Sequence, residues 1–250
     1  NTKKEALLGI SFTGIADCDY KKFDLKKAAA VAVNTNEIWA NNLGIKKSAR
    51  ITTTKPAGTS SLILGTSSGS HGRHAPFYIR RIRYNKDEPI AIYLQKFHPE
   101  IIEQDVFSST TIVVSIPQKS PECSIFRNED PINLLERIKY FYENWILPGH
   151  VSGPNTHNIS CTVSLKNHEW EKVGNWMWDN RDSYVAISVL PYDGGNYSQS
   201  PFEDTTEEIY NNMLSKLKNI DITKVLEDGD YTDLQGELAC SGGACEVTFG

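Results

Sequence analysis

Short apolar runs alternate with segments of helical periodicity along most of this chain, and few folds are compatible with that alternation. Parallel strands need long crossover connections between neighbours, and helices usually form those connections. We therefore expect an α/β domain with largely parallel strand pairing. The runs with the length, β-branched content and Gly or Pro flanks of buried strands cover residues 7–13, 49–54, 110–116, 159–165 and 184–190.

The clearest helix is predicted between Asp24 and Gly44. Apolar residues in this segment follow a mostly helical spacing, Asp24 suits the N-cap, and Gly44 suits the left-handed conformation that ends many helices. Further helices are predicted over 87–97, 131–147, 167–178 and 205–217. Their signals are Pro89 and Pro131 in first turns, Asn167 as an N-cap, and a capping box of Thr205 and Glu208. Pro117 is expected to end the predicted strand 110–116.

The net negative charge of the chain argues against nucleic acids and anionic membranes as its partners. The chain has 31 acidic and 26 basic side chains and a formal charge of −5, whereas proteins that bind nucleic acid or anionic membranes present basic surfaces. It has no run of 18 apolar residues, so we expect a cytoplasmic protein with no membrane span and no direct nucleic-acid partner. Because it starts at Asn1 and soon enters a predicted buried strand, we expect a piece of a longer protein.

A loop of small residues follows the second predicted strand. Small residues let a backbone approach a ligand closely, hydroxyls donate to phosphate oxygens, and free N–H groups at a helix start attract anions. The segment matches neither a Walker loop nor the dinucleotide-binding glycine motif. It is thus either a phosphate-binding loop or an ordinary turn with capping hydroxyls. Its residues after Lys55 are Pro56, Ala57, Gly58, Thr59, Ser60 and Ser61.

Two cysteines, Cys240 and Cys245, lie close together in an acidic C-terminal segment without periodicity. Thiols at this spacing, joined by small residues, can close a disulfide and exchange it repeatedly. A half zinc site and unrelated free thiols are the competing interpretations, but no second pair of Cys or His ligands has suitable spacing, so no metal site is predicted. Buried, inert thiols are expected at Cys18, Cys123 and Cys161.

A basic stretch covers residues 68–83 and includes His71 and His74. Its arginines can meet an anionic substrate. Three of them flank isoleucines, however, so we expect these three to be the exposed members of a strand. They are Arg80, Arg81 and Arg83, beside Ile79 and Ile82.

Further candidates for the lining of an active site lie beside the later strands. His157 and Asn158 adjoin the fourth predicted strand, and Pro191 and Tyr192 follow the fifth. Open α/β folds place their sites at strand ends, although tight-turn chemistry explains the residues after Tyr192 equally well. With His71 and His74, these four residues complete the predicted lining.

Several motifs occur together in a fixed order along the chain. They are 55–59, the His-Gly-Arg-His and Tyr-Ile-Arg-Arg sequences within 68–83, 157–162, Glu169-Trp170 with Trp176, 190–195, 201–203, and the Cys240/Cys245 pair. Together they resemble the C-terminal part of adenosylcobalamin-dependent (class II) ribonucleotide reductases, most closely the ribonucleoside-triphosphate reductases. The resemblance extends over essentially the whole sequence.

The resemblance implies a fold more specific than the strand pattern does. The catalytic domain of that family is a ten-stranded α/β barrel built from two five-stranded halves. Residues 1–219 would then be the C-terminal half of the barrel, and residues 220–250 a mobile redox-active tail.

The resemblance also implies radical chemistry. In that family, cobalt–carbon homolysis in adenosylcobalamin generates a cysteine thiyl radical, which removes the 3′ hydrogen of a ribonucleotide; the 2′ hydroxyl leaves as water, and a dithiol supplies two electrons. By this resemblance Pro56 to Ser61 bind substrate phosphates, whereas Cys240 and Cys245 reduce the active-site disulfide and are regenerated by thioredoxin or a similar reductant. The cofactor is expected to bind mainly to the N-terminal remainder of the same enzyme.

Two departures from the family pattern limit these expectations. The Pro-Ser-Gly-Thr form common in relatives is Pro56-Ala57-Gly58-Thr59 here, which shifts the proposed phosphate contacts toward Thr59 and Ser60. The Asn-x-Cys-x-Glu motif that carries the thiyl cysteine has no counterpart, so this chain alone is expected to be inactive. The alternative is a nucleotide- or phosphate-binding α/β module without a redox role.

Overall fold

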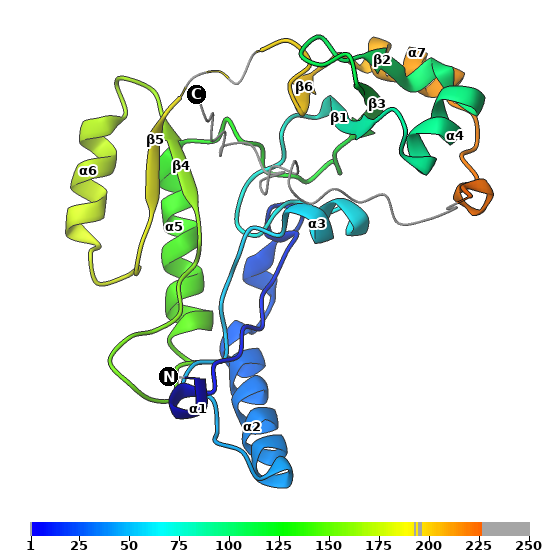
Figure 1. The fold of residues 1–250 in the computed structure, drawn as a ribbon. Helices are drawn as coiled ribbons and strands as arrows, with labels where there is room; N and C mark the ends of the chain where they lie inside the picture. Colours follow the sequence, from blue (N-terminus) through cyan, green and yellow to red (C-terminus); the bar gives the residue numbers. More distant parts are fainter. Residues whose placement is uncertain (1, 193, 195–196, 227–250) are drawn as a thin grey trace. The chain divides into compact units, whose positions relative to one another are not determined.

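Each of two units in the structure is assembled from two separate stretches of the chain (Figure 1). Unit 1 comprises residues 1–73 and 123–192, and unit 2 comprises residues 74–122 and the chain from residue 193 onward. The computed structural model describes residues 2–192, 194 and 197–226. Most of the predicted redox tail, including Cys240 and Cys245, thus lies outside the described residues.

Unit 1 has the parallel pairing that the strand pattern predicts. Strand β4 (Thr162–Leu165) pairs in parallel with β5 (Ser188–Pro191). The predicted strands 7–13 and 49–54 form isolated bridges instead of regular strands. Two of these bridges are parallel, from Ile10 to Thr52 and from Thr54 to Ile159, whereas the bridge from Arg50 to His150 is antiparallel. The α/β class is therefore confirmed. The described residues do not form a closed barrel, and the half-barrel remains a prediction.

Helices cover the β segments of unit 1, and their ends follow the capping signals closely. Asp24 caps α2 by accepting from the Lys27 N–H at 3.0 Å, and Gly44 ends it with φ of 64°. Glu169, rather than Asn167, occupies the N-cap of α6, because residues 166–169 form a turn first. The helices are α1 (Thr2–Glu5), α2 (Leu25–Leu43), α3 (Gly58–Leu64), α5 (Pro131–Phe141), continued by a π-helical turn at Tyr142–Ile146, and α6 (Trp170–Asp179).

The core of unit 1 packs α5 and its π-helical turn against the β segments. Trp145 is buried, and its indole N–H donates to the Thr53 carbonyl at 3.0 Å. Thr52 in turn donates through its hydroxyl to the Trp145 carbonyl at 2.6 Å. These reciprocal bonds fix the segment 50–54, which leads directly into the predicted phosphate loop.

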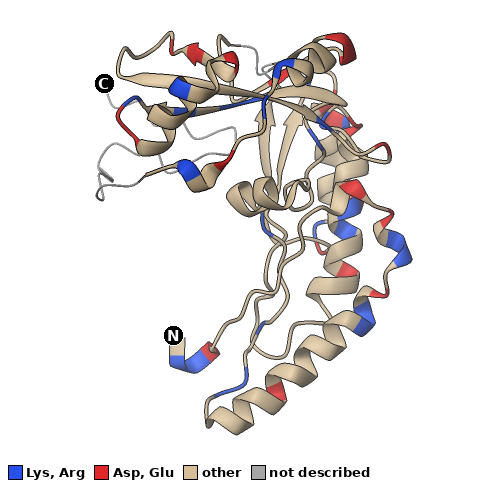
Figure 2. Cartoon of the chain, turned by 90° about the vertical axis from the view of Figure 1, so that its right-hand side faces the viewer, with Lys and Arg blue, Asp and Glu red and all other residues tan. Residues whose placement is uncertain are grey.

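Helix α2 has an unusual distribution of side chains. Its buried positions include the small residues Ala29 and Ala40, whereas Trp39 and Leu43 are 59% and 64% exposed. The helix carries few charges along its length (Figure 2). A helix normally buries its large apolar side chains, so this exposed face is suited to contact with another polypeptide surface.

Unit 2 is built on an antiparallel sheet. The prediction of largely parallel pairing is therefore wrong for this unit. Its strand order is β2-β3-β1-β6, and β3 continues through Pro117 to Lys119. Strand β2 pairs only with residues 112–114, so Pro117 lies where a missing N–H costs little. The strands are β1 (Phe77–Asn85), β2 (Ile102–Gln104), β3 (Thr111–Lys119) and β6 (Phe202–Asp204).

Two helices accompany the sheet of unit 2. They are α4 (Pro89–Phe97), which begins with Pro89 as predicted, and α7 (Glu207–Lys216). Thr206 caps α7 by accepting from the Ile209 N–H at 3.2 Å, one residue later than the predicted capping box. Residues of α4, β2 and β3 form the apolar core of the unit. Among the described residues, no helix is long and apolar enough to cross a lipid bilayer.

Candidate functional site

The predicted phosphate loop lies directly after the parallel segment 50–54 of unit 1 and runs into α3. Ser61 is 3% exposed, and its hydroxyl donates to the carbonyls of Ala57 and Gly58 inside the loop. Thr59 and Ser60 are exposed, and their hydroxyls make no hydrogen bond to any described residue. Of the three predicted hydroxyls, those of Thr59 and Ser60 are the two that face solvent.

A second loop, residues 65–72, backs the predicted phosphate loop. Gly69 has φ of 54°, and a Cβ atom at this position would lie 2.6 Å from the Lys55 carbonyl oxygen. Only glycine permits such an approach at a left-handed φ. The close contact therefore determines where the chain can pass at residues 55 and 56.

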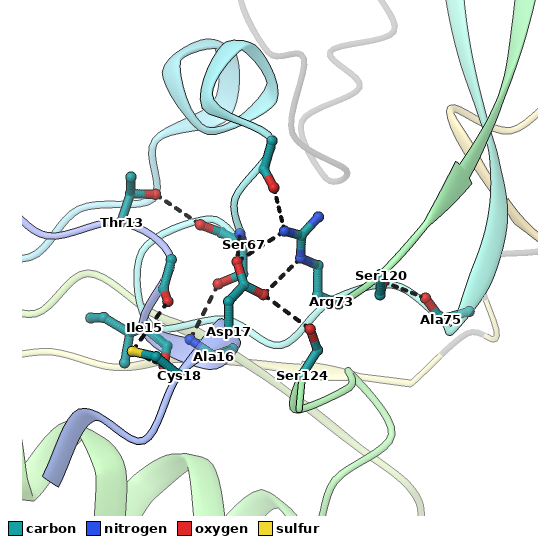
Figure 3. A network of polar contacts seen from close by, with 12 residues as sticks. Thr13, Ile15, Ala16, Asp17, Cys18, Ser67, Arg73, Ala75, Ser120 and Ser124 are labelled. Carbon is teal, nitrogen blue, oxygen red and sulfur yellow. Dashed lines mark hydrogen bonds and ion pairs between the residues drawn. The ribbon is translucent and has the colours of Figure 1, made fainter. Parts of the chain in front are cut away.

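An ion pair that no sequence motif predicts connects Arg73, directly after the second loop, to Asp17 (Figure 3). Asp17 and Arg73 have side chains only 14% and 9% exposed, and the Arg73 Nε lies 2.8 Å from Asp17 Oδ1. Burial disfavours the charged carboxylate, but hydrogen bonds from Arg73 and the Ser67 N–H, with the charge of Arg73, hold the pKa of Asp17 below its usual value. Asp17 lies in irregular chain, where no periodicity marks it.

His71 connects the second loop to strand β4. Its Nε2 accepts from the Thr162 N–H at 3.1 Å, so its Nδ1 carries the proton and donates to the Ser68 carbonyl at 3.3 Å. Burial lowers the pKa of His71, which favours the neutral ring that these two bonds require. The two bonds occupy both ring nitrogens.

His74 belongs to unit 2, in contrast to His71. Its Nε2 lies 2.8 Å from Asp204 Oδ1, and its ring stacks on Phe202. These contacts join the chain before β1 to strand β6. The two histidines of the basic stretch thus belong to different units, a division that no pattern in the sequence predicts.

The neighbouring arginines correct one expectation. Arg80 and Arg81 are both 8% exposed, rather than exposed members of a strand. Arg81 forms ion pairs with Glu103 and Glu203, and the Arg80 guanidinium lies 4.4 Å from the Phe202 ring centroid. Ion pairs and a ring contact offset the cost of burying the charges, so alternation with isoleucine is a poor guide here.

The remaining lining candidates lie at two different ends of the β segments in unit 1. Asn158 precedes β4, and its carbonyl accepts from the Thr53 hydroxyl at 2.9 Å; its neighbour His157 contacts the Leu8 carbonyl at 2.7 Å. Pro191 is the last residue of β5, and the exposed Tyr192 follows it. Because β4 and β5 are parallel, the pair before β4 and the pair at the end of β5 lie at opposite ends of these strands.

The described cysteines differ sharply in environment. The expectation of a buried thiol is correct for Cys161 but wrong for Cys18 and Cys123, which are exposed. Burial raises the pKa of the Cys161 thiol to about 12, which makes it inert at neutral pH. Cys240 and Cys245 lie outside the described residues.

A cavity of about 340 Å³ lies between the 3₁₀ turn at 20–22 and α5 in unit 1. Its lining includes Lys21, Glu129, Glu136 and Arg137. Arg137 and Glu129 neutralise each other in a buried pair. The space is much smaller than a corrin macrocycle with its substituents, so we assign no cofactor to it.

Comparisons with known proteins test the resemblance. No protein-family model matches the sequence. Curated relatives named adenosylcobalamin-dependent ribonucleoside-triphosphate reductase include those of Lactobacillus helveticus, with 26% identity over 226 residues, and Lacticaseibacillus paracasei, with 26% identity over 227 residues. Each match covers 86% of this chain but 29% of the relative, so the chain spans less than a third of the relatives' length.

A solved structure agrees in fold. The crystal structure of a B12-dependent (class II) ribonucleotide reductase matches with a TM-score of 0.74 and 21% identity, covering 90% of this chain and 35% of that one. The match extends over nearly all of this chain. The resemblance predicted from the motifs is therefore confirmed: this chain is similar in sequence to adenosylcobalamin-dependent ribonucleoside-triphosphate reductases and in fold to a class II ribonucleotide reductase.

Proposed function

We propose that this chain is the C-terminal part of an adenosylcobalamin-dependent ribonucleotide reductase that converts ribonucleotides, as triphosphates, to 2′-deoxyribonucleotides. The similarity that runs over 86% of the chain to reductases of this name carries the proposal. Residues 1–219 would form the second half of the catalytic barrel, which the consecutive parallel bridges and the β4–β5 pair support. The exposed apolar face of α2 is suited to contact with the remainder of the enzyme.

The loop from Pro56 to Ser61 would hold the substrate phosphates in this enzyme. It follows a parallel β segment, and its exposed Thr59 and Ser60 hydroxyls are available to phosphate oxygens. The buried Ser61 would shape the loop through its bonds to Ala57 and Gly58. Pro191 and Tyr192, at the end of β5, are the best placed of the other candidates to line a site at the carboxyl ends of the strands.

The histidines and Asn158 would act mainly by fixing the framework of the site. His71 uses both ring nitrogens in hydrogen bonds, and His157 and Asn158 bond to Leu8 and Thr53. His74 would support unit 2 through Asp204.

Cys240 and Cys245 would form the dithiol shuttle in residues 220–250. Each cycle would oxidise their two thiols to a disulfide while the active-site disulfide is reduced to two thiols, with the protons passing from one pair to the other. Thioredoxin or a similar dithiol would then reduce the tail disulfide. The six-residue segment Cys240-Ser241-Gly242-Gly243-Ala244-Cys245 has small residues between the thiols, which supports ring closure with little strain.

Adenosylcobalamin would supply the radical that starts the reaction. We assign no residue of this chain to the cofactor, because the cavity beside α5 is too small and too charged to hold it. The thiyl cysteine also has no counterpart in this sequence. Both would reside in the remainder of the enzyme, and this chain alone would not turn over substrate.

The test is reduction of CTP to dCTP by the longer polypeptide that carries this sequence, with adenosylcobalamin and a small dithiol. We expect product only when the cofactor is present, and we expect the double variant Thr59→Ala/Ser60→Ala to raise KM about tenfold or more, as loss of phosphate contacts requires. Ser215→Ala, an exposed change on α7, is the matched control. Nucleotide binding without reduction would favour the binding-module alternative and contradict the proposal.

A further inference from the structure

We propose that Asp17 is a positioning residue for the predicted phosphate loop and acts through Ser67 and Arg73. We call Thr13, Asp17, Ser67 and Arg73 the Asp17 clamp; all four belong to unit 1. The inference rests on the proposed phosphate-binding function of residues 56–61. It adds a residue that no motif of the chain marks and that lies outside the loop itself.

Both carboxylate oxygens of Asp17 are fully engaged. Oδ1 accepts from Arg73 Nε at 2.8 Å and from the Ser124 hydroxyl at 3.2 Å. Oδ2 accepts from Arg73 Nη2 at 2.9 Å and from the Ser67 N–H at 2.7 Å (Figure 3). An aspartate with four such bonds has no free capacity for a ligand, so its role is to position other groups.

Ser67 transmits this arrangement to the second loop. Its hydroxyl accepts from the Ala16 N–H at 3.2 Å. Its carbonyl accepts from the Thr13 hydroxyl and from the Gly14 N–H, both at 2.8 Å. The N–H, the hydroxyl and the carbonyl of this one residue are therefore all bonded to residues 13–17.

The next step leads from Ser67 to the phosphate loop. The Gly69 N–H donates to the Thr13 hydroxyl at 3.3 Å, which sets the position of Gly69 relative to the clamp. Gly69 in turn lies so close to Lys55 that a Cβ atom would be 2.6 Å from the Lys55 carbonyl oxygen and 3.2 Å from the Pro56 Cα. A shift of Gly69 would thus move residues 55 and 56. These residues begin the loop that carries Thr59 and Ser60.

The charge of Asp17 is essential to this arrangement. Arg73 is buried beside the carboxylate and also donates to the Gly65 carbonyl. Replacing Asp17 by asparagine would remove the carboxylate that forms two hydrogen bonds with this guanidinium, and removing one member of a buried ion pair is strongly unfavourable. The local chain would have to rearrange to admit water, and residues 65–73 would move first.

The test measures CTP binding by isothermal titration calorimetry to the longer polypeptide that carries this sequence, without reductant. We expect Asp17→Asn to raise Kd about tenfold or more, because small displacements of positioning groups have effects of this size. Asp130→Asn is the matched control: it also removes one charge from an ion pair, with Lys172 at 2.8 Å, and asparagine still suits the N-cap of α5. We expect its Kd to equal that of the wild-type chain.

A purely structural role for Asp17 would lower the thermal midpoint but leave Kd unchanged well below that midpoint, and this result would overturn the proposal. Thr13→Val keeps the side-chain shape and removes only the hydroxyl between Ser67 and Gly69, so it applies even where Asp17→Asn does not fold. An unchanged Kd in Thr13→Val would also overturn the proposal.

The double variant Thr59→Ala/Ser60→Ala separates this inference from the proposed function. Weaker binding in that variant but not in Asp17→Asn or Thr13→Val would overturn the positioning role and leave the phosphate loop supported. Binding that the double variant does not weaken, or no binding of CTP by the wild-type longer polypeptide, would overturn the phosphate-loop assignment and the positioning role with it.

Discussion

The backbone N–H of Thr162 donates to Nε2 of His71 at 3.1 Å, a bond that exists only while that ring nitrogen is unprotonated. Burial lowers the pKa of His71 below its ordinary value near 6.5. The folded chain therefore binds this proton less readily than the unfolded chain does. The stabilisation is complete above about pH 6.5 and is lost as the pH falls below that value.

We expect His71→Phe to lower the free energy of unfolding at pH 7.5 by about 1–3 kcal/mol, because the Thr162 N–H loses its acceptor. The stability gap between wild type and variant should narrow at pH 5.5. Urea unfolding at both pH values measures this gap. His168→Gln, a change at an exposed histidine, should keep the wild-type pH dependence, and an equal gap at both pH values for His71→Phe would contradict the assignment.

Two glycine substitutions in unit 1 should have opposite effects. A Cβ atom at Gly149 would lie 1.9 Å from the Thr52 hydroxyl oxygen, so we expect Gly149→Ala to destabilise the fold by about 1–3 kcal/mol or more. A Cβ atom at Gly174, inside α6, would meet nothing within 4 Å, and we expect Gly174→Ala to stabilise by about 0.5–1 kcal/mol. Thermal unfolding followed by circular dichroism compares the two, and a stable Gly149→Ala protein would show that the close approach is wrong.

The described thiols should react in a fixed order. Cys18 and Cys123 are exposed and Cys161 is buried with a pKa raised to about 12, so we expect iodoacetamide to modify the first two while Cys161 remains protected until the chain unfolds. Peptide mapping by mass spectrometry, with and without urea, identifies the modified residues. Rapid native labelling of Cys161 would contradict the buried environment.

The proposed dithiol shuttle makes a prediction about reductants. In the longer enzyme we expect Cys240→Ser or Cys245→Ser to abolish multiple turnover driven by thioredoxin but to spare turnover driven by a small dithiol, which reaches the active-site disulfide directly. Cys18→Ser, a change at an exposed thiol outside the tail, should leave both activities intact. Equal loss with both reductants would remove the shuttle from the proposal.

Local signals in the sequence predicted local structure well. Asp24 and Gly44 bound α2 as expected, because capping depends on a few neighbouring residues. The antiparallel sheet of unit 2 depends instead on pairs such as Arg80 with Phe202, which are far apart in the chain. Periodicity carries no information about such partners, so the division into two units could not be predicted from it.

The candidate site shows the same limit. An unusual composition marks the predicted phosphate loop in the sequence, whereas no local signal marks Asp17, because its partners, Ser67 and Arg73, are more than 45 residues away in sequence. Arg80 and Arg81 were placed on the surface because their alternation with isoleucine is typical of exposed strand residues. The carboxylates and the ring that offset the charges of these arginines come from elsewhere in unit 2.

The interleaving of the two units has a consequence for synthesis on the ribosome. Strand β1 emerges before residues 123–192, which complete the other unit, and its partner β6 follows only after them. Until then one edge of β1 has no strand beside it, and unpaired edges are prone to association with other chains. A nascent chain that pauses before residue 202 would therefore be the form most in need of a chaperone.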